Sequence, residues 1–178
     1  RRFRRRIEDG RFPLRMYAMM DGRAEAFAHF CDAGPLHHPS GRLTVESVKF
    51  FADGALGSRG AALLEPYADA PDNRGLLLHD AEDFREAVTA VVDAGFQVNT
   101  HAIGDRANRF VLDAYAAASA GARPLRRPRI EHAQVMHPRD RARLEDLGVV
   151  ASVQPGFARS DQSWAPDRLG PERLSYAY

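Results

Sequence analysis

Five segments of the chain carry the apolar or alternating hydrophobic pattern that is typical of β-strands. These segments cover residues 15–20, 43–51, 96–102, 129–135 and 149–155. Helical patterns separate the later segments, so that strands and helices alternate along the sequence. Such serial alternation predicts a parallel sheet of the α/β class, either open and doubly wound or closed into an eight-stranded barrel.

The clearest helical pattern lies between the second and third predicted strands. Its apolar stripe has the spacing of one helix face and consists of Phe84, Ala87, Val88, Val91 and Val92. Asp80 or a neighbour is expected to start this helix, and Gly95 to end it. Further helices are predicted from about residue 105 to 116–118, over 138–148, and, as a short segment, after Pro171.

Polar residues within two predicted strands discriminate between the open sheet and the barrel. One face of the third strand reads Gln97, Asn99, His101, and one face of the fifth reads Val150, Ser152, Gln154. Parallel strands that are buried on both faces normally read as continuous apolar runs. A file of polar residues therefore favours the functional interior of a barrel.

Composition indicates a soluble globular protein with one domain, since the 178 residues are 44% hydrophobic and 28% charged. Seven arginines fall among the first fifteen residues, but the cluster is short and acidic residues interrupt it, so we expect no nucleic-acid partner. The single cysteine, Cys31, excludes an internal disulfide. No apolar run reaches the length of a membrane span, which predicts a cytoplasmic protein. The chain does not begin with methionine, so we expect that its natural N-terminus, and any signal there, is missing.

Lys49 is the only lysine among the 25 basic side chains, and it lies within a largely apolar strand. Arginine stays protonated, whereas a buried lysine can lose its proton and act as an amine. A structural interpretation is a lysine that extends its ammonium from a strand end or pairs with Glu46 or Asp53. The functional interpretation depends on its neighbours.

Three consecutive predicted strands place Lys49, His101 and His132 near their carboxyl ends, where the active sites of such folds gather. The separations are 52 and 31 residues, about one β-α unit each. Neutral imidazole binds zinc and similar ions, and a lysine carbamate offers two anionic oxygens that can bridge two metals. The sequence therefore predicts a metal site formed by these three residues.

Four sequence phrases resemble the amidohydrolase superfamily, and within it the YtcJ-like branch known as amidohydrolase family 3. They are VKFFADGALGSR at 48–59, NTHAIGDRA at 99–107, IEHAQ at 130–134 and SVQP at 152–155. Their order and spacing fit the family from about residue 15 to residue 178. The resemblance is carried by the four phrases together, since none of them is specific alone.

This resemblance implies that the chain is part of a metal-dependent hydrolase, a segment of a (β/α)₈ TIM barrel that covers about strands 3 to 7 and lacks strands 1, 2 and 8. Lys49, as a carbamate, His101 and His132 would be the metal ligands on strands 4, 5 and 6. The His-x-His pair of strand 1 and the catalytic aspartate of strand 8 have no counterpart in the sequence. Expected substrate-binding residues are Asp53, Ser58, Arg59 and Gln154, and Asp105 is expected to cap a helix.

The implied reaction is hydrolysis of a C–N bond in a small amide, imide or formamide by water activated on one or two divalent ions, most simply zinc. A non-catalytic remnant of a barrel that serves as a binding module is the alternative, because ligands are missing. A nucleotide-binding α/β domain is disfavoured, since no Gly-x-Gly-x-x-Gly or phosphate loop follows a strand. The sequence does not set the oligomeric state, and a homodimer is one option.

Overall fold

A computed structural model describes residues 2–23, 26–121 and 123–178 of the chain. Its strands are β1 (Met16–Asp21), β2 (Leu36–His37), β3 (Leu43–Phe51), β4 (Gln97–Ala102), β5 (Arg129–His132) and β6 (Val150–Ser152). The α-helices are α1 (Arg2–Glu8), α2 (Ala26–Ala33), α3 (Ala81–Asp93), α4 (Asp105–Ser119), α5 (Arg141–Asp146), α6 (Gly156–Ser160) and α7 (Ala165–Leu174). A short 3₁₀ turn, Pro138–Asp140, leads into α5. Within the described ranges, no helix is long and apolar enough to cross a membrane.

Five strands form a parallel sheet in the order β1-β3-β4-β5-β6, which confirms the predicted parallel α/β repetition. The short strand β2, which was not predicted, pairs antiparallel with the first half of β3. The predicted strand over residues 129–135 is too long, because β5 ends at His132, where the backbone enters the left-handed region. The last strand, predicted over 149–155, covers only Val150–Ser152.

Helix α3 forms where its apolar stripe predicts it and has the expected ends. The Asp80 side chain accepts a hydrogen bond from the Glu82 backbone amide in the first turn of the helix. Gly95 follows the helix with φ of 84°, a conformation that costs glycine little. The last helix differs from its prediction, since α7 begins at Ala165 and is broken at Gly170, so that Pro171 starts only its second half.

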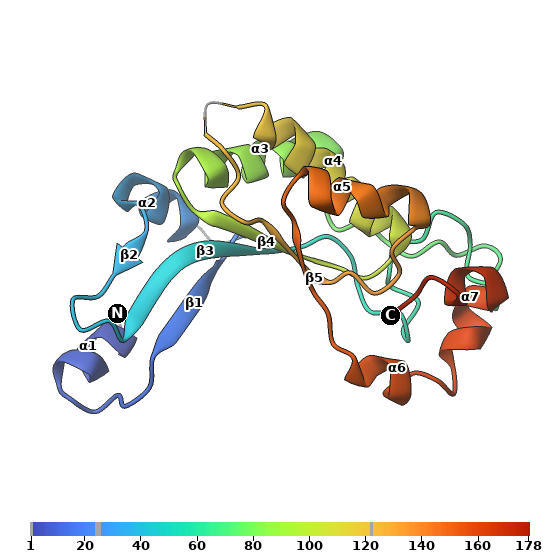
Figure 1. Cartoon of the computed structure of the whole chain (residues 1–178), viewed down its shortest axis with the longest axis horizontal. Helices are drawn as coiled ribbons and strands as arrows, with labels where there is room; N and C mark the ends of the chain where they lie inside the picture. The colour runs from blue at the N-terminus through green and yellow to red at the C-terminus, as the bar shows by residue number, and fades with distance from the viewer. Residues whose placement is uncertain (1, 24–25, 122) are drawn as a thin grey trace.

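The main core lies between the sheet and the layer of α3, α4 and α5, which run along one face of it (Figure 1). Alternate strand residues point into this layer. The core includes Val48, Phe50, Val98 and Ile130 from the strands and Phe84, Val88, Val91, Leu112 and Tyr115 from the helices. The other strand residues, including Lys49, Asn99 and His101, point to the opposite face. The predicted polar file is therefore on the face of the sheet that these helices leave uncovered.

A second, smaller core supports the loops at the carboxyl ends of the strands. It joins the long connection over residues 52–80 to α7 and consists of Leu56, Ala61, Leu63, Tyr67, Ile103, Val135 and Leu169. The Ala68 amide donates a hydrogen bond to the Arg168 carbonyl, 2.9 Å away, which attaches the connection to α7. This core fixes the loops that surround the ends of β3, β4 and β5.

Candidate metal-binding site

The structure brings the two strand-end histidines into direct contact. His101 lies at the end of β4 and His132 at the end of β5, and their ring centroids are 4.6 Å apart at an interplanar angle of 73°. On the other side, His101 contacts the ring of Phe51, the last residue of β3, at 5.6 Å. The Lys49 ammonium lies 4.1 Å from the centre of that same ring. The three predicted ligands thus gather along three adjacent strands.

His132 reaches this position through an unusual backbone conformation. Residues that pair across parallel strands point to the same face, and the pairing places Glu131 beside His101 and His132 beside Ala102. Ala102 is fully buried in the core beneath the helices. His132 instead has φ of 78° and Ala133 has φ of 47°, so the strand ends and the imidazole turns toward His101. Such conformations cost about 1–3 kcal/mol each and cluster at functional sites.

Lys49 is half-buried, and its amine has a depressed proton affinity. The Nζ atom donates a hydrogen bond to the carbonyl oxygen of Phe50, 3.1 Å away. Burial lowers the pKa of the Lys49 amine to about 8, the charge of Glu131 opposes this change, and the charge of Arg129 adds to it. A larger fraction of Lys49 is therefore neutral near pH 7 than of an exposed lysine, as carbamate formation requires.

Gln154 holds the His132 ring. Its Oε1 atom lies 2.5 Å from His132 Nδ1, while its Nε2 atom donates to the Ser152 carbonyl at 2.7 Å. Because the amide nitrogen is used on Ser152, Oε1 acts as the acceptor and Nδ1 of His132 carries the proton. This leaves the Nε2 lone pair of His132 available to a metal. Gln154, predicted to bind substrate, therefore orients the ring of His132, a candidate ligand.

The neighbours of His132 also keep its ring neutral. Burial lowers the pKa of His132, and the nearby charges of His101 and Lys49 lower it further, against the effect of the hydrogen bond that His132 donates to Gln154. A neutral imidazole is the form that binds zinc.

Asp53, which was expected to bind substrate, is instead buried inside the protein, with a side chain that is 0% exposed. Its Oδ2 atom accepts hydrogen bonds from the backbone amides of Ala62 at 2.9 Å and Gly104 at 2.8 Å, and its Oδ1 atom accepts one from Ile103 at 3.0 Å. A carboxylate enclosed in this way cannot reach a substrate. Its role is to join the loop after β3 to the loop after β4.

Ser58 and Arg59, also expected to bind substrate, are engaged within the long connection. Arg59 makes two hydrogen bonds to the carboxylate of Asp69, at 3.0 and 2.9 Å, and Arg168 of α7 pairs with the same carboxylate. The exposed Ser58 hydroxyl donates to the Ala55 carbonyl at 3.1 Å. Both side chains thus have hydrogen-bond partners within the protein, and neither has His101 or His132 as its partner.

Asp105, predicted to be a helix cap, is the first residue inside α4, and Gly104 occupies the N-cap position. The Asp105 carboxylate accepts hydrogen bonds from the backbone amides of Leu64 at 2.8 Å and Arg106 at 2.9 Å. The bond to Leu64 spans 41 residues and attaches the long connection to α4. Asp105 is therefore a tether between two segments.

Several buried polar atoms on the histidine side of the sheet lack a well-aligned hydrogen bond. Among the described residues, these atoms are Ser47 Oγ, Asn99 Oδ1, His101 Nε2, Arg129 Nε and Glu131 Oε1. Glu131 and Arg129 still form an ion pair, with 2.7 Å between Oε1 and Nη2. Sequence analysis missed Glu131, although its charge lies close enough to raise the pKa of Lys49. Its position next to His132 in the sequence was the available signal.

The donors present fit a divalent ion only if Lys49 takes part. No group of three or more His, Cys, Asp or Glu side chains within residues 2–23, 26–121 and 123–178 is placed to hold a metal. Two touching imidazoles supply two nitrogen donors, and an ammonium has no lone pair to add. A neutral or carbamate-bearing Lys49 would provide the third donor, and its lowered pKa favours that chemistry.

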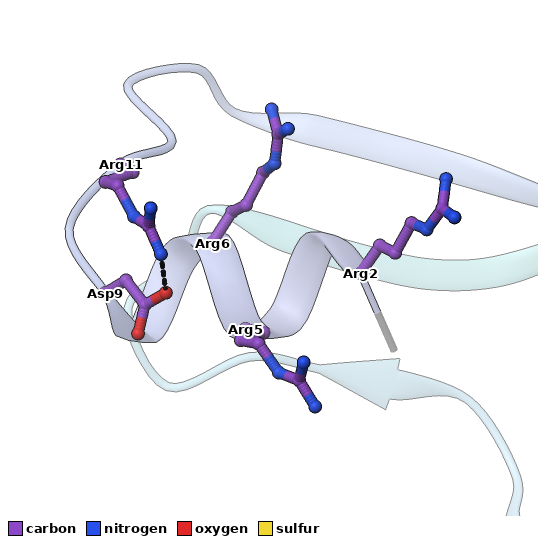
Figure 2. A pocket seen from close by; sticks show the side chains of 5 residues that line it. All are labelled: Arg2, Arg5, Arg6, Asp9 and Arg11. Atoms are coloured by element: carbon purple, nitrogen blue, oxygen red, sulfur yellow. Dashed lines mark hydrogen bonds and ion pairs between the residues drawn. The ribbon is translucent and has the colours of Figure 1, made fainter.

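A small cavity of about 150 Å³ opens beside His132, and a larger hollow lies elsewhere. Phe157 stacks against the His132 ring with centroids 6.0 Å apart and forms part of the small cavity's wall. The larger hollow, of about 730 Å³, is lined by four arginines and one aspartate near α1. Figure 2 shows that Arg2 and Arg6 extend to one side of the helix and Arg5 to the other. Arg11 in this group pairs with Asp9 at 2.5 Å. The cavity beside His132 is the one associated with the candidate ligands.

A parallel α/β sheet with a lysine and two histidines gathered at the ends of adjacent strands is an arrangement suited to metal-dependent hydrolysis. The whole chain, residues 1–178, matches the model of the amidohydrolase family, and the protein belongs to that family. This confirms the resemblance seen in the four sequence phrases.

Individual relatives are longer than this chain. The chain is 44% identical over 133 residues to the Arabidopsis thaliana protein LONG AFTER FAR-RED 3, and 38% identical over 132 residues to the putative amidohydrolase YtcJ of Bacillus subtilis. Each match covers 74% of this chain but only 23% and 25% of those proteins.

Solved structures with the same fold come from two archaea. They are uncharacterized metal-dependent hydrolases from Pyrococcus furiosus and Pyrococcus horikoshii, 32% and 31% identical, each with a TM-score of 0.87. The match covers 99% of this chain and 36% and 35% of theirs. The chain therefore has the fold of about a third of such a hydrolase, and its sheet fits part of a TIM barrel.

Proposed function

We propose that this protein is a metal-dependent amidohydrolase that cleaves a C–N bond in a small amide, imide or formamide. The observation that carries the proposal is the contact between His101 and His132 beside the only lysine of the chain, whose pKa is lowered to about 8. Family membership and the metal-dependent hydrolases of the same fold support it.

The proposed ligands are His101, His132 and Lys49 in its carbamate form, with zinc as the ion. A bound zinc ion would lower the pKa of a water molecule toward about 7 and polarise the scissile carbonyl. We assign the five parallel strands of this chain to strands 3 to 7 of the barrel. On this assignment, further ligands and the general base would belong to strands 1 and 8.

The protein's own groups prepare this chemistry before any ion binds. Gln154 fixes the His132 ring, and burial keeps that ring neutral. The Phe51 ring contacts both the Lys49 amine and the His101 ring. The cavity beside His132 offers a small apolar wall, including Phe157, for a substrate group next to the reacting bond. We propose a small-molecule substrate for this reason, while a cytoplasmic location and a homodimer stay predictions from the sequence.

Metal analysis of the wild-type protein and of a Lys49→Arg variant tests this function. Together with the segments that would carry strands 1 and 8, the protein purified with zinc and bicarbonate should hold zinc in a fixed ratio and hydrolyse members of an amide and imide panel. The variant keeps the positive charge but cannot form a carbamate, so it should lose both properties. An Arg59→Lys variant alters a basic residue that pairs with Asp69, and it should keep the zinc.

Retention of zinc and hydrolysis in Lys49→Arg would refute the role of Lys49. Failure of the wild-type protein to bind zinc would favour the alternative of a non-catalytic barrel segment that serves as a binding module. Hydrolysis of esters but not of amides or imides would leave the metal site in place and correct the bond type.

A further inference from the structure

The buried carboxylate of Asp53 contacts one of the two histidines. Asp53 Oδ1 lies 3.3 Å from Nε2 of His101, and this nitrogen is buried and has no well-aligned hydrogen bond within the described residues. Both oxygens of the carboxylate also accept backbone hydrogen bonds, from Ala62, Ile103 and Gly104. The proposed function uses none of these interactions.

The backbone donors fix the carboxylate independently of the histidine. They come from two loops, 9 to 51 residues away from Asp53 in the sequence. The loops themselves are closely packed, because a Cβ atom on Gly104 would lie 1.9 Å from the carbonyl oxygen of Ala62. The position of Oδ1 is therefore set by the fold, and the imidazole must adapt to it.

A carboxylate oxygen that receives amide protons can only accept, so the nitrogen that faces it must donate. A neutral imidazole carries one N–H, and placing it on Nε2 leaves the lone pair on Nδ1. For His132 the relation is reversed, since Gln154 Oε1 faces Nδ1 and leaves the lone pair on Nε2. The two touching rings would thus offer different nitrogens to the space between them.

We propose that Asp53 is a positioning residue that holds His101 as its Nε2–H tautomer, so that Nδ1 is the nitrogen presented to a metal ion. The assignment of the proton follows from the geometry of the chain alone, whereas its use in metal binding rests on the proposed function. The same carboxylate joins the loops after β3 and β4, so it fixes both the place and the tautomer of the ligand. Hydrogen-bonded partners of this kind commonly contribute 10- to 100-fold to metal affinity.

Nitrogen-15 NMR of histidine-labelled, metal-free protein at neutral to mildly alkaline pH tests the tautomers directly. The His101 signals are assigned by their loss in a His101→Gln variant. We expect the proton of His101 on Nε2 and that of His132 on Nδ1. In Asp53→Asn, an amide nitrogen can replace the acceptor that faces His101, so its tautomer should shift toward Nδ1–H while that of His132 is unchanged. Zinc affinity, measured by calorimetry, should fall about 10- to 100-fold.

Asp105→Asn is the matched control. Asp105 is also a buried carboxylate that accepts backbone amides from a distant segment, but its hydrogen-bond partners include no imidazole. This variant should lose stability, as Asp53→Asn should, and keep both the His101 tautomer and the zinc affinity. An equal loss of affinity in both variants would show a general structural effect and refute the positioning role.

A wild-type His101 that carries its proton on Nδ1 would overturn the proposal, and this result does not require any variant to fold. Should Asp53→Asn fail to fold, the wild-type spectrum decides alone. Should the tautomers be as expected while zinc does not bind, the proposed function fails and the role of Asp53 in holding His101 stands.

Discussion

The imidazole of His132 meets that of His101 edge to face at 4.6 Å, although strand alternation would direct His132 into the helical layer. The change of direction is achieved by two consecutive residues in the left-handed region, at His132 and Ala133. Neither residue is glycine, so the conformation costs free energy that the surrounding packing must supply. The pairing of the two imidazoles at one edge of the sheet therefore comes with a loss of folding stability.

This pairing should be visible in the titration of His132. Burial lowers the pKa of His132, and the charge of the neighbouring His101 lowers it further. His101→Gln removes the second cause but not the first, so the pKa of His132 should rise while staying below that of an exposed histidine. An NMR titration of the metal-free protein measures the change.

The lowered pKa of His132 also makes the stability of the protein fall toward acid pH. Because the pKa of His132 is lower in the folded protein, the unfolded chain takes up the proton first as the pH falls below about 6.5, the ordinary value for histidine. The stabilising contribution of the neutral ring is therefore lost toward acid pH, and His101→Gln should reduce that loss. Equal acid sensitivity in the wild type and the variant would contradict the interaction.

Asp69 should be the main acid-sensitive link between the long connection and α7. Its carboxylate binds Arg59 in a two-bond arrangement and also pairs with Arg168. The hydrogen bond from Arg59 lowers the pKa of Asp69 below its usual 3.8, so this contribution is complete above pH 3.8 and is lost as the pH falls through the lowered value. Asp69→Asn should lower the Tm by a few degrees at neutral pH.

The difference in Tm between Asp69→Asn and the wild type should close only as the pH falls below 3.8 and through the lowered pKa of the native carboxylate. Asp72→Asn removes the same charge from an exposed position in the same connection and serves as the control. Thermal melts that show the same fall for both variants would mean that net charge, and not the two arginine contacts, is responsible.

Gly104 should tolerate no side chain. Its φ is an ordinary −73°, so the requirement is space: a Cβ atom would lie 1.9 Å from the carbonyl oxygen of Ala62. Gly104→Ala should therefore separate the two loops joined by Asp53 and destabilise the protein by more than about 3 kcal/mol. Gly156, at the start of α6, has nothing within 4 Å of such a Cβ atom. Gly156→Ala should be neutral or stabilise by up to about 1 kcal/mol in urea unfolding.

Local patterns were sufficient for much of the fold. The bounds of β3, the stripe of α3, and its ends at Asp80 and Gly95 follow from hydrophobic periodicity and from the chemistry of single residues. The polar file at Asn99 and His101 correctly indicated the face that the helices do not cover, because alternation along a strand is a local property. The gathering of His101 and His132 could likewise be expected, since strand ends of a parallel sheet meet at one edge.

The details of the site depend on distant partners and could not be predicted. Asp53 looked like a loop residue facing substrate, but its surroundings are built from backbone amides up to 51 residues away. Arg59 looked free to bind substrate, yet the fold supplies Asp69 as its partner. The turn at His132 is an exception to strand alternation. Neither of its two left-handed residues is a glycine or a proline, so the local sequence does not indicate the turn.

Lys49 should take up carbon dioxide at a lower pH than an ordinary lysine. With a pKa of about 8, roughly one amine in ten is neutral at pH 7, against about one in three thousand for a lysine of pKa 10.5. Only the neutral amine attacks carbon dioxide, and forming the carbamate releases the N–H proton. At constant dissolved CO₂ the carbamate should therefore increase steeply with pH below about 8 and less steeply above it. Carbon-13 NMR with labelled CO₂ measures it, and the signal can be assigned because the chain has no other lysine.

Lys49→Arg should abolish the carbamate signal, which leaves only the α-amino group as a background amine. Stability rises with pH here as it does for Asp69, but the charged form of Lys49 destabilises the fold: the depressed pKa means that folding works against a charged Lys49 below pH 8, and stability should recover as the pH rises from about 8 toward 10.5. Lys49→Met, which carries no charge at any pH, should therefore lack this rise. A carbamate that forms only near pH 10.5, or a rise in stability that persists in Lys49→Met, would show that the fold does not depress the proton affinity of Lys49.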